Sequence, residues 1–346
     1  MWKKLALLLG ACVVSLVLAE IGVRLLPGVV VGYHYENGSF RRPREFDLRR
    51  PRNRLGFHDV EHGEKKPGVT RIVLLGDSFV EAVAVGAQET VGRRLEHELN
   101  AGDRERYEVV SLGRGGSGQR KQLRILRKLG PELAPDLVIT LFLTSNDVAD
   151  NSPELFRLRN QETRRYLRSS PPHLPAEDAI GLVFEASALN RLIAYRMTRS
   201  RTRRLYRGIP VDFLVLRESY DATWEKAWND TQGLLLQTRR AAESLGARYA
   251  IVSAATPYGT RGEAGLRELI EAFPSMEELT WDLDKPDRRL SEFAASHDIP
   301  LLTLEPAFRE QARGAEHRFH WKYDGHWNTD GHRLAGALIA DFVRRL

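Results

Sequence analysis

Cysteine is almost absent from this chain of 346 residues. The single cysteine, Cys12, lies in an apolar stretch near the N-terminus. No disulfide can therefore form within the chain, and a zinc site built from several cysteines is excluded. The sequence also shows no internal repeat and no zinc-finger or RNA-recognition motif, so we predict no nucleic-acid partner.

Negative charge is in the minority. The chain has 52 Lys and Arg against 46 Asp and Glu, which gives a formal net charge of +6. The excess is concentrated in two Arg-rich stretches, "RRPREFDLRRPRNR" at residues 41–54 and "RMTRSRTRRLYR" at residues 196–207. Such stretches can bind acidic glycans or anionic headgroups, or can form a solvated face. Because no recognition motif accompanies the charge, the solvated face is the favoured interpretation.

A segment able to cross a membrane opens the chain. Lys3 and Lys4 precede an uncharged stretch at residues 5–19, and Pro27-Gly28 ends the helix that this stretch predicts. A helix reaching Leu26 would measure roughly 33 Å, close to the ~30 Å of a bilayer's hydrocarbon core. We therefore predict that residues 1–28 form a transmembrane anchor or a signal peptide.

Three interpretations of this segment stay open. The favoured one is an uncleaved single-pass anchor in the inner membrane, with the lysines in the cytoplasm and the body of the protein outside it. A cleavable signal peptide ending at Val17-Leu18-Ala19 would release the body instead. A lipoprotein signal around Cys12 is disfavoured, because too few apolar residues precede Leu9-Gly10. In both leading interpretations the body is exported.

Two segments with different compositions follow the membrane segment. Residues 29–68 are rich in Arg, Pro, Gly and His, show little periodicity, and are predicted to form a membrane-proximal arm. Residues 69–346 are predicted to form one domain, because apolar strands alternate there with amphipathic helices. Strands are predicted at 71–78, 107–113, 135–143, 248–256 and 300–305, and helices at 88–100, 118–130, 223–246, 288–299 and 330–346.

This alternation predicts an α/β fold. Strands separated by helices pair in parallel, and helices then cover both faces of the sheet. We expect a five-stranded parallel sheet in a three-layer α/β/α sandwich of the flavodoxin-like kind. Residues 150–220 interrupt the pattern, since they are Arg-rich and broken by prolines. We predict an insertion there, with a helix at residues 188–206, and long insertions of this kind act as lids or substrate walls.

Polar residues gather where the predicted strands end. Ligands of open parallel sheets bind outside the carboxyl ends of the strands, so these residues are expected to converge. They are a serine, a glycine-rich turn, an amide and an acid–histidine pair, in "GDSF" (residues 76–79), "SLGRGGSGQ" (111–119), "TSNDVAD" (144–150) and "YDGHWNTDGH" (323–332). A nucleophile, oxyanion donors, a base and a group that orients the base are the components of acyl transfer.

With these four motifs in this order, the chain resembles the SGNH (GDSL-type) hydrolase superfamily. The stretch before and through the first motif, residues 53–79, resembles that of the membrane-anchored bacterial members. The resemblance covers residues 53–346. Two departures concern the second and third motifs, where Ser111 replaces a usual Asn and Thr144 a usual Gly. A third is the spacing Asp324-Gly325-His326, one residue shorter than the common Asp-x-x-His.

The resemblance implies a role for each residue. Ser78 would be the nucleophile, His326 the general base and acid, and Asp324 the group that orients the imidazole. The oxyanion hole would consist of the Ser78 amide, the Gly116 amide and the Asn146 side chain. The start of a helix beside Ser78 would add a favourable dipole. No cofactor is implied.

Several neighbouring residues have less specific readings. His332 is predicted to be structural, with Asn328 or Thr329 capping the final helix. Trp327 could line the pocket or fill the core. His317 and His320 lie near Asp324 in the sequence, but their irregular spacing does not suit a metal ion, so no metal site is predicted.

The favoured function is that of a serine esterase or O-deacylase that cleaves acyl, above all acetyl, esters of a carbohydrate or lipid outside the cytoplasm. One alternative is an O-acetyltransferase that modifies an exported polysaccharide. Another is a non-catalytic envelope or glycan-binding protein, which the intact set of Ser78, Asn146, Asp324 and His326 disfavours. The sequence predicts no particular oligomeric state.

Overall fold

The computed structural model describes residues 2–25, 34–36, 39–41, 46, 51–102, 106–168, 187–189, 192–193, 208–313, 318–322 and 324–346. The chain divides into two compact units. The first unit comprises Met1–Arg44 and Gln161–Arg207, and the second comprises Glu45–Asn160 and Gly208–Leu346. The domain boundaries expected from the sequence, 1–28, 29–68 and 69–346, stay predictions.

The first unit contains the apolar N-terminal helix. Helix α1 (Trp2–Leu25) is long and apolar enough to cross a membrane, because its most apolar stretch of 18 residues has a mean hydropathy of 2.4. Only 6% of that stretch is buried within the structure. A signal sequence has the same properties, so anchoring and orientation stay predictions. Strands β1 (His34–Glu36) and β2 (Ser39–Arg41) form an antiparallel pair. Most of the helix predicted at 188–206 lies outside the described residues.

The second unit is built on a parallel sheet of five strands in the order β4-β3-β5-β6-β7. This is the 2-1-3-4-5 order of flavodoxin-like folds, so the predicted fold class is confirmed. At the carboxyl edge, Gly76 lies opposite Gly113 in the register of β3 and β4. The strands are β3 (Thr70–Gly76), β4 (Tyr107–Gly113), β5 (Leu137–Phe142), β6 (Arg248–Ser253) and β7 (Leu301–Thr303).

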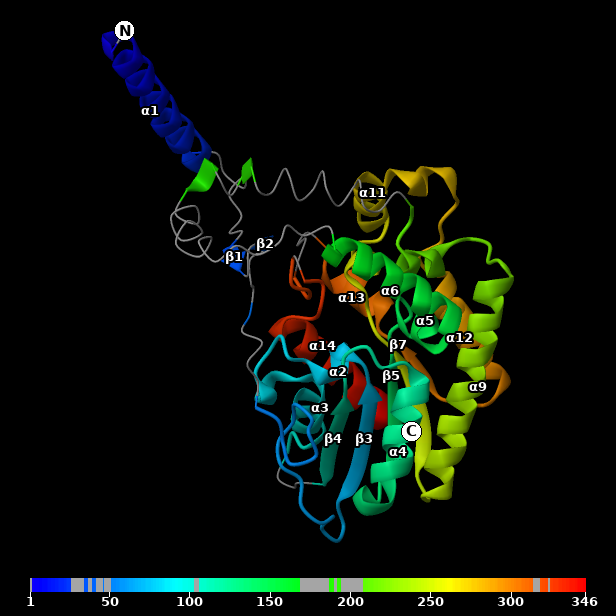
Figure 1. Cartoon of the computed structure of the whole chain (residues 1–346). Coiled ribbons are helices and arrows are strands. Elements are labelled where there is room, and N and C mark those ends of the chain that lie inside the picture. The colour runs from blue at the N-terminus through cyan, green and yellow to red at the C-terminus, as the bar shows by residue number, and fades with distance from the viewer. Residues whose placement is uncertain are drawn as a thin grey trace. The chain divides into compact units, whose positions relative to one another are not determined.

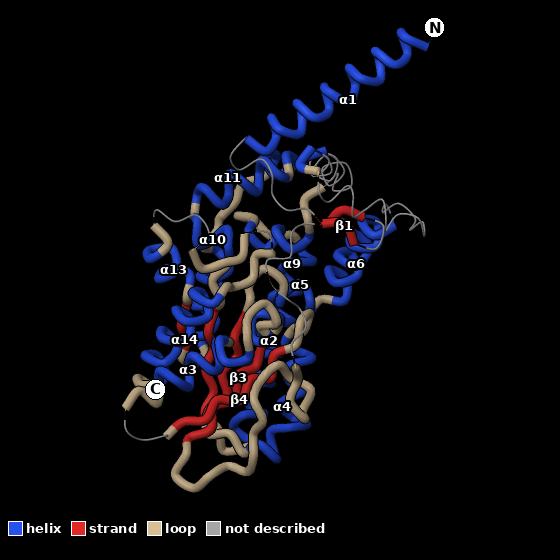
Figure 2. The backbone as a smooth tube through the Cα atoms, turned by 90° about the vertical axis from the view of Figure 1, so that its left-hand side faces the viewer, coloured by secondary structure: helices blue, strands red, loops and turns tan. Residues whose placement is uncertain are grey.

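Helices cover both faces of this sheet, which gives the predicted three layers (Figures 1 and 2). Side chains of β3 alternate between two cores: Val73 and Leu75 belong to one, and Ile72 and Leu74 to the other. The first core is closed by α4 (Gln119–Leu133), α9 (Ala222–Ser244) and α12 (Lys285–Ser296). The second is closed by α3 (Val91–Leu99), α13 (Glu305–Gln311) and α14 (Thr329–Val343).

Helix α4 does not end where the sequence predicts. It continues through Pro131 to Leu133, and Ala134 closes it with a left-handed φ of 45°. Gly130 has a packing role instead, because a Cβ there would lie 2.5 Å from the Cδ1 atom of Leu245. The predicted stop at Gly130 was therefore wrong.

The irregular region expected at 150–220 is partly ordinary domain structure. Val211 and Val215, from the 3-10 helix η2 (Val211–Leu216), lie in the first core. Helices that the sequence did not predict are η1 (Ala87–Glu89), α5 (Asp147–Asn151), α6 (Pro153–Arg168), α10 (Pro257–Arg261), α11 (Glu263–Ala272) and η3 (Pro274–Glu278). Apart from α6, which has 16 residues, they are too short to show the long periodicity from which helices are predicted. Helix α2 (Ser78–Glu81) is the helix expected beside Ser78.

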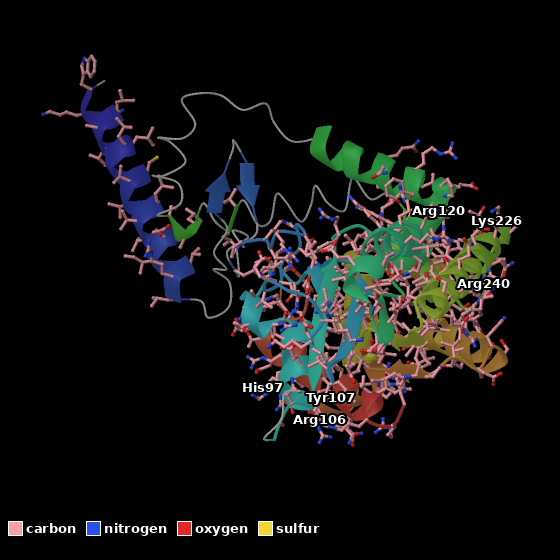
Figure 3. The ribbon with its side chains drawn as sticks, turned by 90° about the horizontal axis from the view of Figure 1, so that it is seen from below. His97, Arg106, Tyr107, Arg120, Lys226 and Arg240 are labelled. Carbon is pink, nitrogen blue, oxygen red and sulfur yellow. The ribbon has the colours of Figure 1, made fainter. Side chains whose placement is uncertain are left out.

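Positive charge lies on the outer faces of the helices. Helix α4 exposes Arg120, Arg124, Arg127 and Lys128 to solvent. Figure 3 labels Arg120 together with Lys226 and Arg240 of α9. The Arg-rich stretch at residues 196–207 lies outside the described residues.

A buried charged network joins the segment before β3 to the sheet. The His62 Nε2 atom lies 2.9 Å from Asp59 Oδ2, and its Nδ1 atom lies 2.9 Å from Glu108 Oε1. Arg71 of β3 pairs with Glu108, and Arg93 of α3 pairs with Asp59. Burial lowers the pKa of His62, but its hydrogen bonds to the two carboxylates outweigh burial and raise the pKa above its usual value. The two carboxylates therefore favour the imidazolium form of His62.

We predict that His62→Ala lowers the free energy of unfolding by about 3 kcal/mol, because it leaves the buried Asp59 without one cationic partner. Since the pKa of His62 is raised from 6.5, its contribution is full below that pH and is lost as pH rises through the folded-state value. Urea unfolding at about pH 6 and about pH 9 measures the difference. The control His97→Ala removes an exposed histidine and should change stability by less than about 0.5 kcal/mol. An equal loss for His62→Ala at both pH values would contradict the assignment.

Candidate active site

Ser78 stands at the sharp turn where β3 ends. Asp77 caps the following helix α2, since its Oδ1 atom accepts a hydrogen bond of 2.9 Å from the Phe79 amide. Gly76 must be glycine, because a Cβ there would lie 2.3 Å from Val80 Cγ2. Figure 1 shows α2 at the arrowhead of β3. The helix is a single turn that ends at Ala82, so the dipole support expected for Ser78 is limited to one turn.

His326 lies beside Ser78 although 248 positions separate them in the sequence. The distance between His326 Nε2 and Ser78 Oγ is 2.8 Å. On the other side of the ring, His326 Nδ1 is hydrogen-bonded to Asp324 Oδ1. The intervening Gly325 has a left-handed φ of +87°, a conformation that glycine adopts freely. This glycine lets the shortened Asp-x-His motif bring both side chains together.

Two tryptophans, Trp321 and Trp327, hold the turn that carries His326. The Trp321 amide donates to the His326 carbonyl at 2.8 Å, and Trp327 is fully buried beneath the site in the second core. Its indole Nε1 donates to the carbonyl of Ala255 at 3.1 Å. Of its two readings from the sequence, Trp327 is thus a core residue. The Phe79 ring packs between it and His326, with ring centroids at 5.0 Å and 5.1 Å.

The last helix begins as predicted. Asn328 caps α14, with its Oδ1 atom accepting a 3.0 Å hydrogen bond from the Gly331 amide. His332 is buried against Trp327, and burial lowers its pKa to about 3. It is therefore neutral at physiological pH. Among the residues that the structure describes, no cluster of His, Cys, Asp and Glu could hold a metal ion, and His317 lies outside them.

Asn146 and Gly116 come from the loops after β5 and β4. The Asn146 Nδ2 atom donates to Asp77 Oδ2 at 3.1 Å, so the amide faces the residue next to Ser78. Gly116 has a left-handed φ of +61° and is exposed. Space for a Cβ exists there, so backbone conformation rather than crowding favours glycine. The residues expected to form an oxyanion hole therefore lie on three adjacent strand ends.

Charges around the imidazole set its protonation. Burial lowers the pKa of His326, but the hydrogen bond and charge of Asp324 outweigh burial and raise the pKa above its usual value. Asp77 is buried, and burial raises the pKa of its carboxyl. A hydroxyl on one imidazole nitrogen and a carboxylate on the other is an arrangement that can activate a serine and stabilise the imidazolium that forms.

Sequence reasoning missed two residues that support this geometry. Asp77 lay within the first motif and was considered only as a cap of the following helix, which it is, whereas its hydrogen bond with the Asn146 amide was not predicted. Glu81 also follows Ser78 closely, and its carboxylate accepts the Gly115 amide at 2.7 Å. A lone acid in a one-turn helix shows no periodicity, so the only available signal was its proximity to the serine.

The comparisons with known proteins concern the fold. No protein-family model matches the chain, and no curated protein does. Solved structures similar to it include a lipase/acylhydrolase from Enterococcus faecalis, with 14% identity, a TM-score of 0.40, and coverage of 80% of this chain and 96% of that chain. A lipolytic protein of the G-D-S-L family from Veillonella parvula has 12% identity, a TM-score of 0.43, and coverage of 80% and 100%.

A GDSL-like lipase from Bacteroides thetaiotaomicron has 12% identity, a TM-score of 0.41, and coverage of 82% of this chain and 93% of that chain. Two of these names, that of the Veillonella parvula protein and that of the Bacteroides thetaiotaomicron protein, contain the term GDSL.

We predict that the pKa of His326 lies above 6.5 and that Asp324→Asn lowers it, because the substitution removes the charge that favours the imidazolium. An NMR titration of the histidine ring protons measures both values. His332 is the internal control, since burial should keep its ring neutral in both proteins. A His326 pKa that does not respond to Asp324→Asn would rule out the pairing.

Proposed function

We propose that this protein is a serine hydrolase of the SGNH type that cleaves ester bonds. Ser78 is the nucleophile, His326 the general base and acid, and Asp324 the group that orients the imidazole. The observation that carries the proposal is the 2.8 Å distance between Ser78 Oγ and His326 Nε2, with Asp324 on the opposite ring nitrogen.

The reaction proceeds through an acyl-enzyme. Ser78 Oγ attacks the ester carbonyl while its proton passes to His326 Nε2, and a tetrahedral oxyanion forms. The Ser78 amide, the Gly116 amide and the Asn146 side chain stabilise this oxyanion. Collapse breaks the bond to the alcohol, which leaves with the proton from His326. Water, deprotonated by the same imidazole, then releases the carboxylic acid and restores Ser78.

The proposed substrate is an acyl ester, above all an acetyl ester, of a carbohydrate or lipid outside the cytoplasm. Helix α1 supports this location, because its length and hydropathy suit an inner-membrane anchor. With the anchor uncleaved, the hydrolase domain would act on esters in the envelope or on exported polymers.

We expect Ser78→Ala and His326→Ala each to lower kcat for p-nitrophenyl acetate by about 10⁴–10⁶-fold, since the two act as one unit. Asn146→Ala should lower it by about 10²–10³-fold, the usual cost of one oxyanion donor. Ser244→Ala, an exposed serine at the end of α9, is the control and should leave kcat unchanged.

The same assay on an acetylated glycan, with and without a sugar acceptor, identifies what receives the acyl group. Turnover without acceptor is the result expected for a hydrolase. Turnover that requires the acceptor would indicate an acetyltransferase with the same nucleophile. Unchanged activity in both Ser78→Ala and His326→Ala would overturn the assignment of the site.

A further inference from the structure

The carboxylate of Glu81 joins two loops of the proposed active site. Its Oε2 atom accepts a hydrogen bond from the Gly115 amide at 2.7 Å, and its Oε1 atom accepts one from Arg52 Nη2, also at 2.7 Å. Glu81 ends the single-turn helix that begins at Ser78, and Gly115 directly precedes Gly116. The carboxylate therefore connects the nucleophile's helix to the loop that carries the proposed oxyanion donor.

These two loops touch closely. A Cβ on Gly115 would lie 2.9 Å from Glu81 Oε2 and 3.8 Å from Ser78 Cβ. A Cβ on Gly113 would lie 2.1 Å from the Glu81 amide nitrogen. Glycine at both positions lets the backbone after β4 pass directly over the end of α2. The Gly115 peptide thus lies between Ser78 and the carboxylate that binds it.

A segment ahead of the sheet holds the same two loops from outside. We call residues 52–59 the buttress segment. Its buried His58 donates from Nδ1 to the Glu81 carbonyl at 2.9 Å. The Gly56 carbonyl of the segment accepts hydrogen bonds from Arg114 Nη2 at 3.2 Å and from Arg52 Nη1 at 3.1 Å. Glu81 and the glycine loop are therefore both fixed to this segment.

We propose that Glu81 is a positioning residue that holds the Gly115 peptide so that the Gly116 amide faces the oxyanion formed on Ser78, and that Arg52 holds the Glu81 carboxylate in place. The proposal rests on the proposed hydrolase function and extends it to two residues outside the four motifs. A charge-assisted hydrogen bond to a backbone amide is strong and directional. Donors fixed in advance need no reorganisation when the oxyanion forms.

The ion pair of Glu81 with Arg52 also reduces the negative charge near the proposed oxyanion. A bare carboxylate near a developing oxyanion would oppose its formation, and a guanidinium on the far oxygen offsets that repulsion. At the same time the charge of Glu81 adds to those of Asp324 and Asp77 in favouring protonated His326. Glu81 therefore affects both the geometry of the oxyanion loop and the protonation of the base.

The test compares Glu81→Ala, Glu81→Gln and Arg52→Ala in the full chain, with Arg54→Ala as the matched control. Arg54 lies two residues from Arg52 and its guanidinium binds the His62 carbonyl at 2.9 Å rather than Glu81. Glu81→Ala should lower kcat by about 10²-fold with KM nearly unchanged, because the lost contact acts in the transition state. Glu81→Gln keeps an oxygen that can accept the Gly115 amide and should recover most of that loss.

The two other variants test the partner and the charge. Arg52→Ala should lower kcat by less than Glu81→Ala does, and should have no further effect in a Glu81→Gln background, where the ion pair is already absent. Glu81→Gln should move the acid limb of the kcat/KM profile to lower pH, since one charge favouring the imidazolium is gone. Arg54→Ala should leave kcat and the pH profile unchanged.

Active sites are counted by end-point labelling with a fluorophosphonate, so that kcat refers to folded protein even if Glu81→Ala folds poorly. An unchanged kcat in Glu81→Ala, or a loss in Glu81→Gln as large as in Glu81→Ala, would overturn the proposal. A loss confined to KM would overturn it as well. If Ser78→Ala retains full activity, the proposed function fails first, and that result is distinct from these.

Discussion

The hydrogen bond between Ser78 and His326 depends on the register of the parallel sheet. The carboxyl ends of β3, β4 and β5 lie at one edge, with Gly76 opposite Gly113 and Leu75 opposite Thr140. The loops that follow these strands therefore start side by side. Because side chains alternate between faces, a shift of one residue in β3 would exchange the side chains that Val73 and Ile72 send into the two cores, and it would displace Ser78. The register that buries the apolar side chains of the sheet is thus the same register that places Ser78.

His326 reaches the same edge through a different support. The carbonyl of Ala255, after β6, accepts hydrogen bonds from Trp327 Nε1 at 3.1 Å and from His320 Nε2 at 3.2 Å. The next residue, Thr256, donates its amide to buried Glu305 at 2.9 Å, and burial raises the pKa of Glu305 to about 7. The base is therefore placed by the ends of β6 and β7, whereas the nucleophile is placed by β3.

The sequence predicted the parts of this structure that depend on long patterns. Continuous apolar strands and amphipathic helices carry a signal over many residues, so the five-stranded parallel sheet and its three layers were predicted, whereas the order of the strands comes from the structure. The residues Ser78, Asn146 and His326 stood out because polar motifs at strand ends converge. The buttress segment and the ion pair of Arg52 with Glu81 did not stand out, since single charged residues give no indication of their partners. The end of α4 was predicted wrongly at residue 130, because the helix continues through Pro131 to Leu133.

Carboxylates near the proposed site would repel the oxyanion that the proposed reaction creates, unless they are neutral or paired with a cation. Four carboxyl groups lie close by. Asp77 is buried and accepts hydrogen bonds from the Phe79 amide and the Asn146 side chain. Asp147 is buried beside Asp77, and burial together with that neighbour's charge raises its pKa well above the usual value, which favours the neutral form. Glu81 is paired with Arg52. Asp324 faces the ring that becomes cationic as the oxyanion forms.

The carboxylate of Asp324 is the one that faces the imidazole directly. Asp324 lies on the far side of His326 from Ser78, so its charge acts on the proton acceptor and not on the nucleophile. The Asn146 amide and the Gly116 backbone are the donors proposed for the oxyanion. Through Glu81, Arg52 ties the loop after β4 to the buttress segment, which lies within the predicted arm of residues 29–68. A chain lacking that segment would retain the hydroxyl, imidazole and carboxylate yet lose this restraint on the loop proposed to hold the oxyanion.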